Sequence, residues 1–287
     1  MTQISPLTFD FEIYSLAFSP NGHLLAWGEG SKVQLWDMSS NRLSRTLEGN
    51  HAGVNYLAFG HSGHLLASGG GYPDTTVQLW DTNSGQLTHT LKGNLGSVTS
   101  IAFSPDELVL ASGGDDNVVR LWDTESGKLL QRLEGYTSAD FSPDGHTLGL
   151  GGKDGAVQLR DLRNNQVLFT LKSEYSGRVS NLLFSPDGRK LASAAGAYLR
   201  IWDVDKRQLL HTFGGYMEWI LDFDFAPDGN TLAFAGNDRR VRLCNTKTGQ
   251  LLKTFPGPST RVAYSPNGHL LAMAGGYKSP IWLWSMP

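Results

Sequence analysis

One sequence unit repeats seven times along the chain, and each copy ends in a related dipeptide. The endings are Trp36-Asp37, Trp80-Asp81, Trp122-Asp123, Arg160-Asp161, Trp202-Asp203, Cys244-Asn245 and Trp284-Ser285. Successive copies are separated by 44, 42, 38, 42, 42 and 40 residues, so the period is nearly constant. Such a period indicates a repeat architecture, in which each unit buries its apolar surface against its neighbours.

Each unit contains three short apolar runs separated by turn sequences. In the third unit the first run ends at Phe103, and Ser104-Pro105-Asp106 separates it from the second run. Proline fixes φ and aspartate can bond its own backbone, so this tripeptide is typical of a turn. The same turn recurs at positions 19–22, 60–63, 142–145, 185–188, 226–229 and 265–268. Three strands joined by two tight turns form a meander.

Together the spacing, the turn and the Trp-Asp ending resemble the WD40 repeat family over essentially the whole chain. Members of that family form β-propellers, in which each repeat contributes one blade around a central channel. The resemblance implies an all-β fold with one domain over residues 1–287. It implies a seven-bladed β-propeller of four-stranded antiparallel blades, with third strands ending near residues 37, 81, 123, 161, 203, 245 and 285.

The N-terminal segment is expected to complete the last blade. Fourth strands end in pairs such as Thr46-Leu47 and Thr170-Leu171, and Thr8-Phe9 repeats this ending. The last unit reaches Pro287 without a fourth strand of its own. We therefore expect residues 3–9 to supply that strand and to close the ring, which removes strand edges that would otherwise template aggregation.

The third strands carry the predicted core. The positions three and one before the Trp site hold Val, Leu or Ile in every unit: Val33, Leu35, Val77, Leu79, Val119, Leu121, Val157, Leu159, Leu199, Ile201, Val241, Leu243, Ile281 and Leu283. Residues two apart in a strand share a face. These fourteen side chains therefore predict one apolar face per blade.

The WD40 resemblance also implies a hydrogen-bonded set of His, Ser or Thr, Asp and Trp in a well-formed blade. Here no unit keeps all four. The Asp position retains Asp74, Asp116, Asp154 and Asp238; the Ser position retains Ser68, Ser112 and Ser193; the His position carries Asn50, Asn94, Tyr175 and Tyr216. We expect polar networks to be replaced by apolar packing, which can be neutral when the whole network goes.

Composition excludes several partner classes. The net charge is -3 and no long Lys/Arg run is present, which is a poor match for nucleic acid or anionic lipid. The single cysteine, Cys244, stands where other units place tryptophan, so a buried thiol is expected. No apolar run approaches the roughly 18 residues of a membrane span, and the N-terminal segment lacks the basic stretch followed by an apolar stretch that is typical of a signal peptide. We expect a cytoplasmic monomer.

No residue pattern points to catalysis, a metal or a cofactor. His23, His64, His146 and His269 follow the first turn of four different units, so they are expected to be exposed and far apart. The chain lacks a recognisable Ser/His/Asp set, paired carboxylates on one loop, and a glycine loop that enters a helix. The sequence therefore predicts a protein that is not an enzyme.

Two loop clusters are candidate partner-binding sites. Unit one has short loops, while the flanking units carry Tyr72 and Tyr277, which predicts a saddle over blade one with a tyrosine on each side. Tyrosines suit binding surfaces, although each could instead pack over its own loop. The second cluster spans units five and six and consists of Tyr175, Arg178, Tyr216, Met217 and Trp219. Such residues are enriched at hot spots, although Trp219 could instead cap its blade.

The resemblance implies a non-catalytic scaffold that binds a protein or peptide at the top face and channel mouth. The alternative is a propeller that binds a small ligand or glycan, or acts as an enzyme, at the central channel. That alternative requires convergent polar residues in a deep pocket, which the sequence does not assemble. A third possibility, assembly through the outer rim, is disfavoured by polar residues on the fourth strands, including Arg45, His89 and Lys253.

Overall fold

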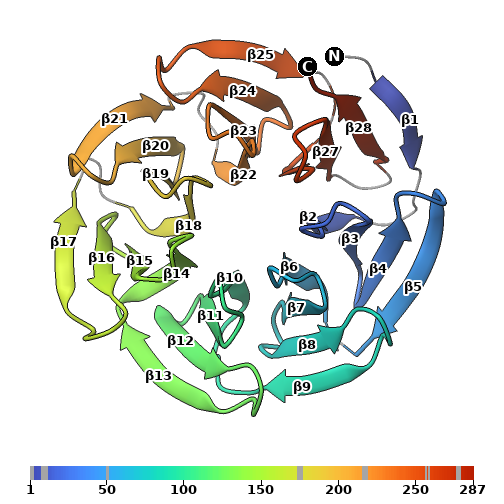
Figure 1. The fold of residues 1–287 in the computed structure, drawn as a ribbon, viewed down its shortest axis with the longest axis horizontal. Coiled ribbons are helices and arrows are strands. Elements are labelled where there is room, and N and C mark those ends of the chain that lie inside the picture. Colours follow the sequence, from blue (N-terminus) through green and yellow to red (C-terminus); the bar gives the residue numbers. More distant parts are fainter. Residues whose placement is uncertain are drawn as a thin grey trace.

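A computed structural model describes residues 3–7, 12–49, 52–172, 177–214, 219–255, 257, 259–275 and 279–287, with the backbone alone for residues 3–7. In this part of the chain the regular structure consists of 28 strands in seven four-stranded sheets. The sheets surround a central axis as the blades of a ring (Figure 1). The predicted seven-bladed, all-β propeller is confirmed. We number the blades 1 to 7 in chain order.

The strand bounds follow the repeat closely. Blade 1 contains β2 (Ile13–Phe18), β3 (Leu24–Glu29), β4 (Lys32–Asp37) and β5 (Arg42–Glu48), and blade 2 contains β6 (Val54–Phe59), β7 (Leu65–Gly70), β8 (Val77–Asp81) and β9 (Leu87–Leu91). Blade 3 contains β10 (Val98–Phe103), β11 (Val109–Gly114), β12 (Val118–Asp123) and β13 (Leu129–Glu134), and blade 4 contains β14 (Tyr136–Phe141), β15 (Thr147–Gly152), β16 (Val157–Asp161) and β17 (Val167–Leu171).

The remaining blades have the same plan. Blade 5 contains β18 (Val179–Phe184), β19 (Lys190–Ala195), β20 (Tyr198–Asp203) and β21 (Gln208–Phe213), and blade 6 contains β22 (Ile220–Phe225), β23 (Thr231–Gly236), β24 (Val241–Asn245) and β25 (Leu251–Phe255). Blade 7 contains β26 (Arg261–Tyr264), β27 (Leu270–Ala274) and β28 (Ile281–Ser285) together with β1 (Gln3–Leu7). The first strand of each blade lies nearest the axis and the fourth forms the rim (Figure 1).

The two ends of the described chain meet in blade 7. Strand β1 pairs antiparallel with β28, and Gln3 lies opposite Trp284 while Leu7 lies opposite Ile281. Thr8 and Phe9, which suggested this arrangement, lie outside the described residues. That β1 holds the ring closed stays a prediction.

The turn between first and second strands is built from its own side chains. In blade 5 the Ser185 hydroxyl donates to Asp187 at 2.6 Å and accepts the Lys190 amide at 2.9 Å. Gly188 closes the turn with φ of 70°, a backbone conformation that side chains disfavour. The equivalent turns of the other blades lie on the same face, which we call the bottom. The opposite, top face carries the loops that enter the first strands and join second to third strands.

Among the described residues the core consists of seven apolar clusters, and each cluster joins two neighbouring blades. All fourteen predicted third-strand side chains are buried, with exposed fractions of 7% or less. Each fully buried Leu, Ile or Val side chain stabilises the fold by about 1.5–3 kcal/mol. Since these contacts lie between blades, stacking the blades into a ring supplies the stability, as the repeat pattern predicts.

Cys244 is fully buried in the cluster between blades 5 and 6, as its position in the repeat predicts. Burial raises the pKa of its thiol to about 12, so it remains protonated at neutral pH. In the described part of the chain, no helix has the length and hydropathy needed to cross a bilayer.

Candidate functional site

The first strands build the wall of the central channel. Counting three residues back from the aromatic at the end of each first strand gives one equivalent position per blade. These positions hold Ser15, Tyr56, Ser100, Ser138, Asn181, Asp222 and Arg261, and all but Ser100 and Ser138 face the channel. In blades 1 to 6 this aromatic is phenylalanine, and in blade 7 it is Tyr264. The repeat therefore places a ring of mostly polar side chains at one level, with long or charged members in blades 2, 6 and 7.

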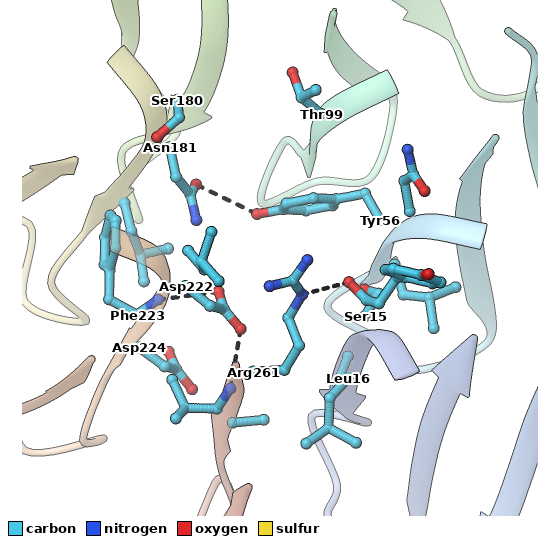
Figure 2. A pocket seen from close by; sticks show the side chains of 18 of the residues that line it. Ser15, Leu16, Tyr56, Thr99, Ser180, Asn181, Asp222, Phe223, Asp224 and Arg261 are labelled. Atoms are coloured by element: carbon cyan, nitrogen blue, oxygen red, sulfur yellow. Dashed lines mark hydrogen bonds between the residues drawn. The ribbon is translucent and has the colours of Figure 1, made fainter. Parts of the chain in front are cut away.

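A cavity of about 560 Å³ occupies the channel. Blades 1, 2, 3, 5, 6 and 7 contribute its lining, which includes Tyr56, Asn181, Asp222, Asp224 and Arg261. These residues come from elements far apart in sequence, and Figure 2 shows how they face the same space. The sequence alone did not assemble convergent polar residues around the channel, and the structure brings these five together.

Tyr56 reaches across this space. Its hydroxyl donates to Oδ1 of Asn181 over 3.4 Å, which joins blade 2 to blade 5 (Figure 2). Burial raises the pKa of Tyr56, and the nearby charges of Asp222 and Asp140 raise it further. The phenol is therefore neutral at physiological pH and available as a hydrogen-bond donor.

Three buried carboxyl groups on first strands link neighbouring blades; Asp222 and Asp224 line the channel cavity and Asp140 does not. The backbone amide of Val262 donates to Oδ2 of Asp222 at 3.0 Å, and the amide of Tyr264 donates to Oδ2 of Asp224 at 2.7 Å. In the same way Asp140 of blade 4 accepts the amide of Phe184 in blade 5 at 2.7 Å. Each carboxyl group thus pins its own blade to the first strand of the next blade.

Burial raises the pKa of these carboxyl groups into the physiological range. The pKa rises to about 7 for Asp140 and Asp224 and to about 6 for Asp222, because the charged form loses hydration. The guanidinium of Arg261 favours the charged form of Asp222 and opposes part of this rise. All three groups therefore titrate near neutral pH, which ordinary surface aspartates do not.

Arg261 is the cation of the channel lining. Its Nε donates to the backbone oxygen of Tyr14 in blade 1, and its Nη1 donates to that of Thr260 at 2.8 Å. Its side chain therefore bridges blades 7 and 1 through carbonyl groups while its charge acts on Asp222. The lining consequently combines one fixed cation with carboxyl groups that can gain or lose protons.

The described binding candidates are exposed on the top face. Tyr72 is 80% exposed, and Trp219 is 68% exposed and also lines the channel cavity. Neither side chain is therefore covered by its own loop or blade. Leu95, 78% exposed on the loop entering β10, belongs to the same face. Sequence reasoning missed Leu95, although an apolar residue in a polar loop was a visible signal.

Arg178 occupies a different place from the one predicted. Its guanidinium forms an ion pair with Asp115 of blade 3 at 2.7 Å and lies 3.5 Å from the Thr99 hydroxyl. It therefore reaches over the short loops of blade 4 instead of joining Trp219 above blade 6. Tyr175, Tyr216, Met217 and Tyr277 lie outside the described residues, and their membership of a binding site stays a prediction.

The hydrogen-bonded set of His, Ser or Thr, Asp and Trp that is typical of WD40 blades is retained in part. Trp80, Trp122 and Trp202 each donate through Nε1 to the predicted serine, at 2.9 Å in all three blades. In blade 3 the buried Arg120 pairs with Asp116 at 2.7 Å and donates to Asn94 at 3.1 Å. The expectation of general replacement by apolar packing is therefore wrong for blade 3, where an arginine extends the network.

No cluster of three or more His, Cys, Asp or Glu side chains suited to a metal ion occurs among the described residues. His23, His64, His146 and His269 are exposed, as the repeat predicts. The described lining of the channel cavity contains aspartate and arginine but neither histidine nor cysteine.

The seven four-stranded blades, three of which carry the Trp–Ser hydrogen bond, define a WD40 β-propeller. A family model described as the IFT122 first beta-propeller matches residues 12–285, and the chain belongs to that family.

Individual relatives match shorter segments. Nuclear distribution protein PAC1 of Coccidioides posadasii is 35% identical over 100 residues, which cover 32% of this chain and 21% of that protein. The WD repeat-containing protein sll1491 of Synechocystis is 31% identical over 31% of this chain and 27% of its own length. Human intraflagellar transport protein 122 homolog is 28% identical over 36% of this chain and 8% of its own length. The chain thus aligns with less than a third of each relative.

Proposed function

We propose that this propeller is a non-catalytic scaffold that binds a protein or peptide on its top face, at the mouth of the channel. The observation that supports this most directly is the exposure of three large apolar side chains, Tyr72, Leu95 and Trp219, on loops of one face. Exposed apolar groups rimmed by polar residues are typical of interaction surfaces. Aromatic residues of this kind also dominate binding energies at interfaces.

The relatives support a binding role without identifying the partner. Their names refer to nuclear distribution and to intraflagellar transport, which are different processes. Because the alignments cover a minor part of each relative, the partner of this chain has to be found directly. We further propose that the protein acts as a monomer in the cytoplasm; light scattering coupled to size exclusion tests the monomer.

Affinity capture followed by reconstitution tests the scaffold. A partner captured by the wild type would be identified, purified and titrated against Tyr72→Ala, Leu95→Ala and Trp219→Ala. Leu108→Ala is the matched control, since Leu108 is 58% exposed in the turn after β10 on the bottom face. We expect at least one top-face variant to weaken binding about tenfold or more, while the control binds normally. Equal binding by all four variants would refute the top face as the site.

The channel cavity favours a second candidate, the binding of a small polar ligand. Its lining brings Asp222, Asp224, Arg261 and Tyr56 around about 560 Å³, within the usual range of small-molecule pockets. Screening polar metabolites and glycans by thermal shift would test this function against wild type and Asp224→Asn. A ligand that stabilises both proteins equally would not occupy this cavity.

A further inference from the structure

Two blades lack the tryptophan that ends the third strand, and the protein fills the resulting space differently in each. In blade 6 the position belongs to Cys244, a much smaller residue. Phe223 and Phe234 pack in the same cluster as Cys244, together with Phe213 of blade 5. The rings of Phe213 and Phe234 lie 5.8 Å apart, so aromatic side chains from other strands occupy this interface.

Blade 4 has no such compensation. Arg160 takes the position of the tryptophan, while Ala139 and Leu150 stand where blade 6 has Phe223 and Phe234. The cluster between blades 3 and 4 contains both of these smaller residues. A cavity of about 500 Å³ lies at this interface.

The walls of this cavity match the surroundings of a tryptophan one blade earlier. Trp122 packs in a cluster with Leu65, Leu79, Phe103 and Leu110. Their counterparts in the following repeat all line the cavity: Val109, Leu121, Phe141 and Leu148. The interface between blades 3 and 4 therefore retains apolar walls of the kind that enclose an indole ring. The residue at the tryptophan position is Arg160, which supplies no such ring.

Arg160 borders the cavity and is held by other groups. Its Nε donates to Gln158 at 2.7 Å, and its Nη2 donates to the Tyr136 hydroxyl at 3.3 Å. The guanidinium carbon also lies 5.6 Å from the centre of the Tyr136 ring. A planar guanidinium fixed in this way can stack on a further aromatic ring.

The cavity is distinct from the top-face site. Its lining includes Pro105 and Gly145 of the two bottom turns, and Leu130 of the rim, which is 56% exposed. Asp144 and His146 add polar groups from the same bottom turn. A ligand would therefore meet a polar entrance on the bottom and rim side, followed by apolar walls.

We propose that the cavity between blades 3 and 4 binds one planar aromatic ring system of the size of indole, either as a free small molecule or as the side chain of a peptide. The apolar walls would bury the ring faces and Arg160 would lie against one of them. This proposal does not depend on the top-face scaffold function.

Titration calorimetry and ligand-observed NMR with indole and with N-acetyl-tryptophanamide test the proposal. Wild type is expected to bind indole. Arg160→Trp, which supplies a ring from the chain itself, is expected to weaken indole binding about tenfold or more. Arg160→Lys leaves the apolar walls intact and is expected to retain indole binding, although more weakly. Binding of N-acetyl-tryptophanamide as well would identify a peptide side chain as an acceptable source of the ring.

A second substitution that fills the cavity keeps the proposal testable if Arg160→Trp does not fold. Val109→Phe adds a ring from the blade 3 wall and is expected to weaken indole binding to a similar degree. Circular dichroism would show which variants are folded. Failure of wild type to bind indole would overturn the proposal, as would indole affinity that folded Arg160→Trp and Val109→Phe leave unchanged.

Discussion

The hydroxyl of Tyr56 in blade 2 donates to the amide oxygen of Asn181 in blade 5, over 3.4 Å and 125 positions of sequence. A side chain thus connects two blades that are not neighbours in the ring (Figure 2). Blade stacking cannot provide such a contact, because each apolar cluster joins successive blades. Tyr56 therefore bridges the channel cavity between blades 2 and 5.

Removing the Tyr56 hydroxyl should have a small effect on stability, whereas removing the ring should have a larger one. We expect Tyr56→Phe to lower the free energy of unfolding by about 1 kcal/mol or less, because the hydrogen bond is long. Tyr56→Ala also removes apolar contacts and should lower it by about 3 kcal/mol. Urea denaturation measures both values. Equal losses would contradict a packing role for the ring.

The three buried first-strand carboxyl groups, Asp140, Asp222 and Asp224, should make stability depend on pH. The pKa is raised in the folded state to about 7 for Asp224 and Asp140 and to about 6 for Asp222, above the unfolded value near 3.9. The folded protein therefore binds more protons than the unfolded chain between these values. Their contribution to stability is present below about pH 4 and is lost as the pH rises through 6 to 7.

Asp224→Asn isolates this effect, since an amide oxygen can still accept from the Tyr264 backbone. We expect its melting temperature to exceed that of wild type at pH 8, and the difference to shrink as the pH falls toward 4. Thermal melts across this range measure it, with exposed Asp205→Asn as the control. A difference that is constant with pH would exclude the titration of Asp224 as its cause.

The ion pair of Arg178 with Asp115 should contribute modestly to stability. The two side chains are 34% and 48% exposed, and pairs in such surroundings contribute about 0.2–1 kcal/mol. A double-mutant cycle with Arg178→Ala and Asp115→Ala should give a coupling energy in that range that declines as salt is added. Coupling that is insensitive to salt would indicate that Arg178 acts through packing.

Arg120 should contribute much more to the free energy of unfolding than Arg178. Its side chain is 1% exposed and pairs with Asp116, which is 8% exposed. Arg120→Met leaves a buried carboxylate without its cation and should lower the free energy of unfolding by about 3–5 kcal/mol. Asp116→Asn in addition should restore part of that loss, because the uncharged amide needs no cation. Strict additivity of the two substitutions in urea denaturation would contradict this network.

Deletion of residues 1–7 tests ring closure by β1. We expect a lower melting temperature and faster aggregation, because the outer edge of β28 would then be unpaired. Static light scattering during a thermal ramp records both changes. A truncated protein that melts and aggregates like wild type would show that the β1–β28 pairing is dispensable.

The architecture was predictable because its signals recur in register. Positions such as Val119 and Leu121 repeat in every unit, so the apolar face of each blade follows from strand geometry alone. The strand positions and the buried faces follow from the spacing of apolar residues and from the residue types that recur in each unit. Both can be observed in a single sequence. The Ser68–Trp80 hydrogen bond was not expected, because the incomplete polar sets indicated apolar packing.

The channel was not predictable in the same way. Tyr56, Asp222, Asp224 and Arg261 are departures from the repeat at inward positions, and their convergence depends on how the ring closes. An alignment of the first-strand sequences would have revealed these charged residues. Whether their side chains meet depends on the distances between blades, which only the folded ring provides. Arg178 was misplaced for a similar reason, because the short loops of blade 4 let it reach blade 3.

The ring position that carries Tyr56, Asn181, Asp222 and Arg261 also holds serine in blades 1, 3 and 4. Seven identical blades would present a visiting molecule with seven equivalent angular settings. Here the donors, acceptors and charges follow one unrepeated order around the circle. The departures from the repeat thus make the channel lining asymmetric, although the seven blades share one backbone plan.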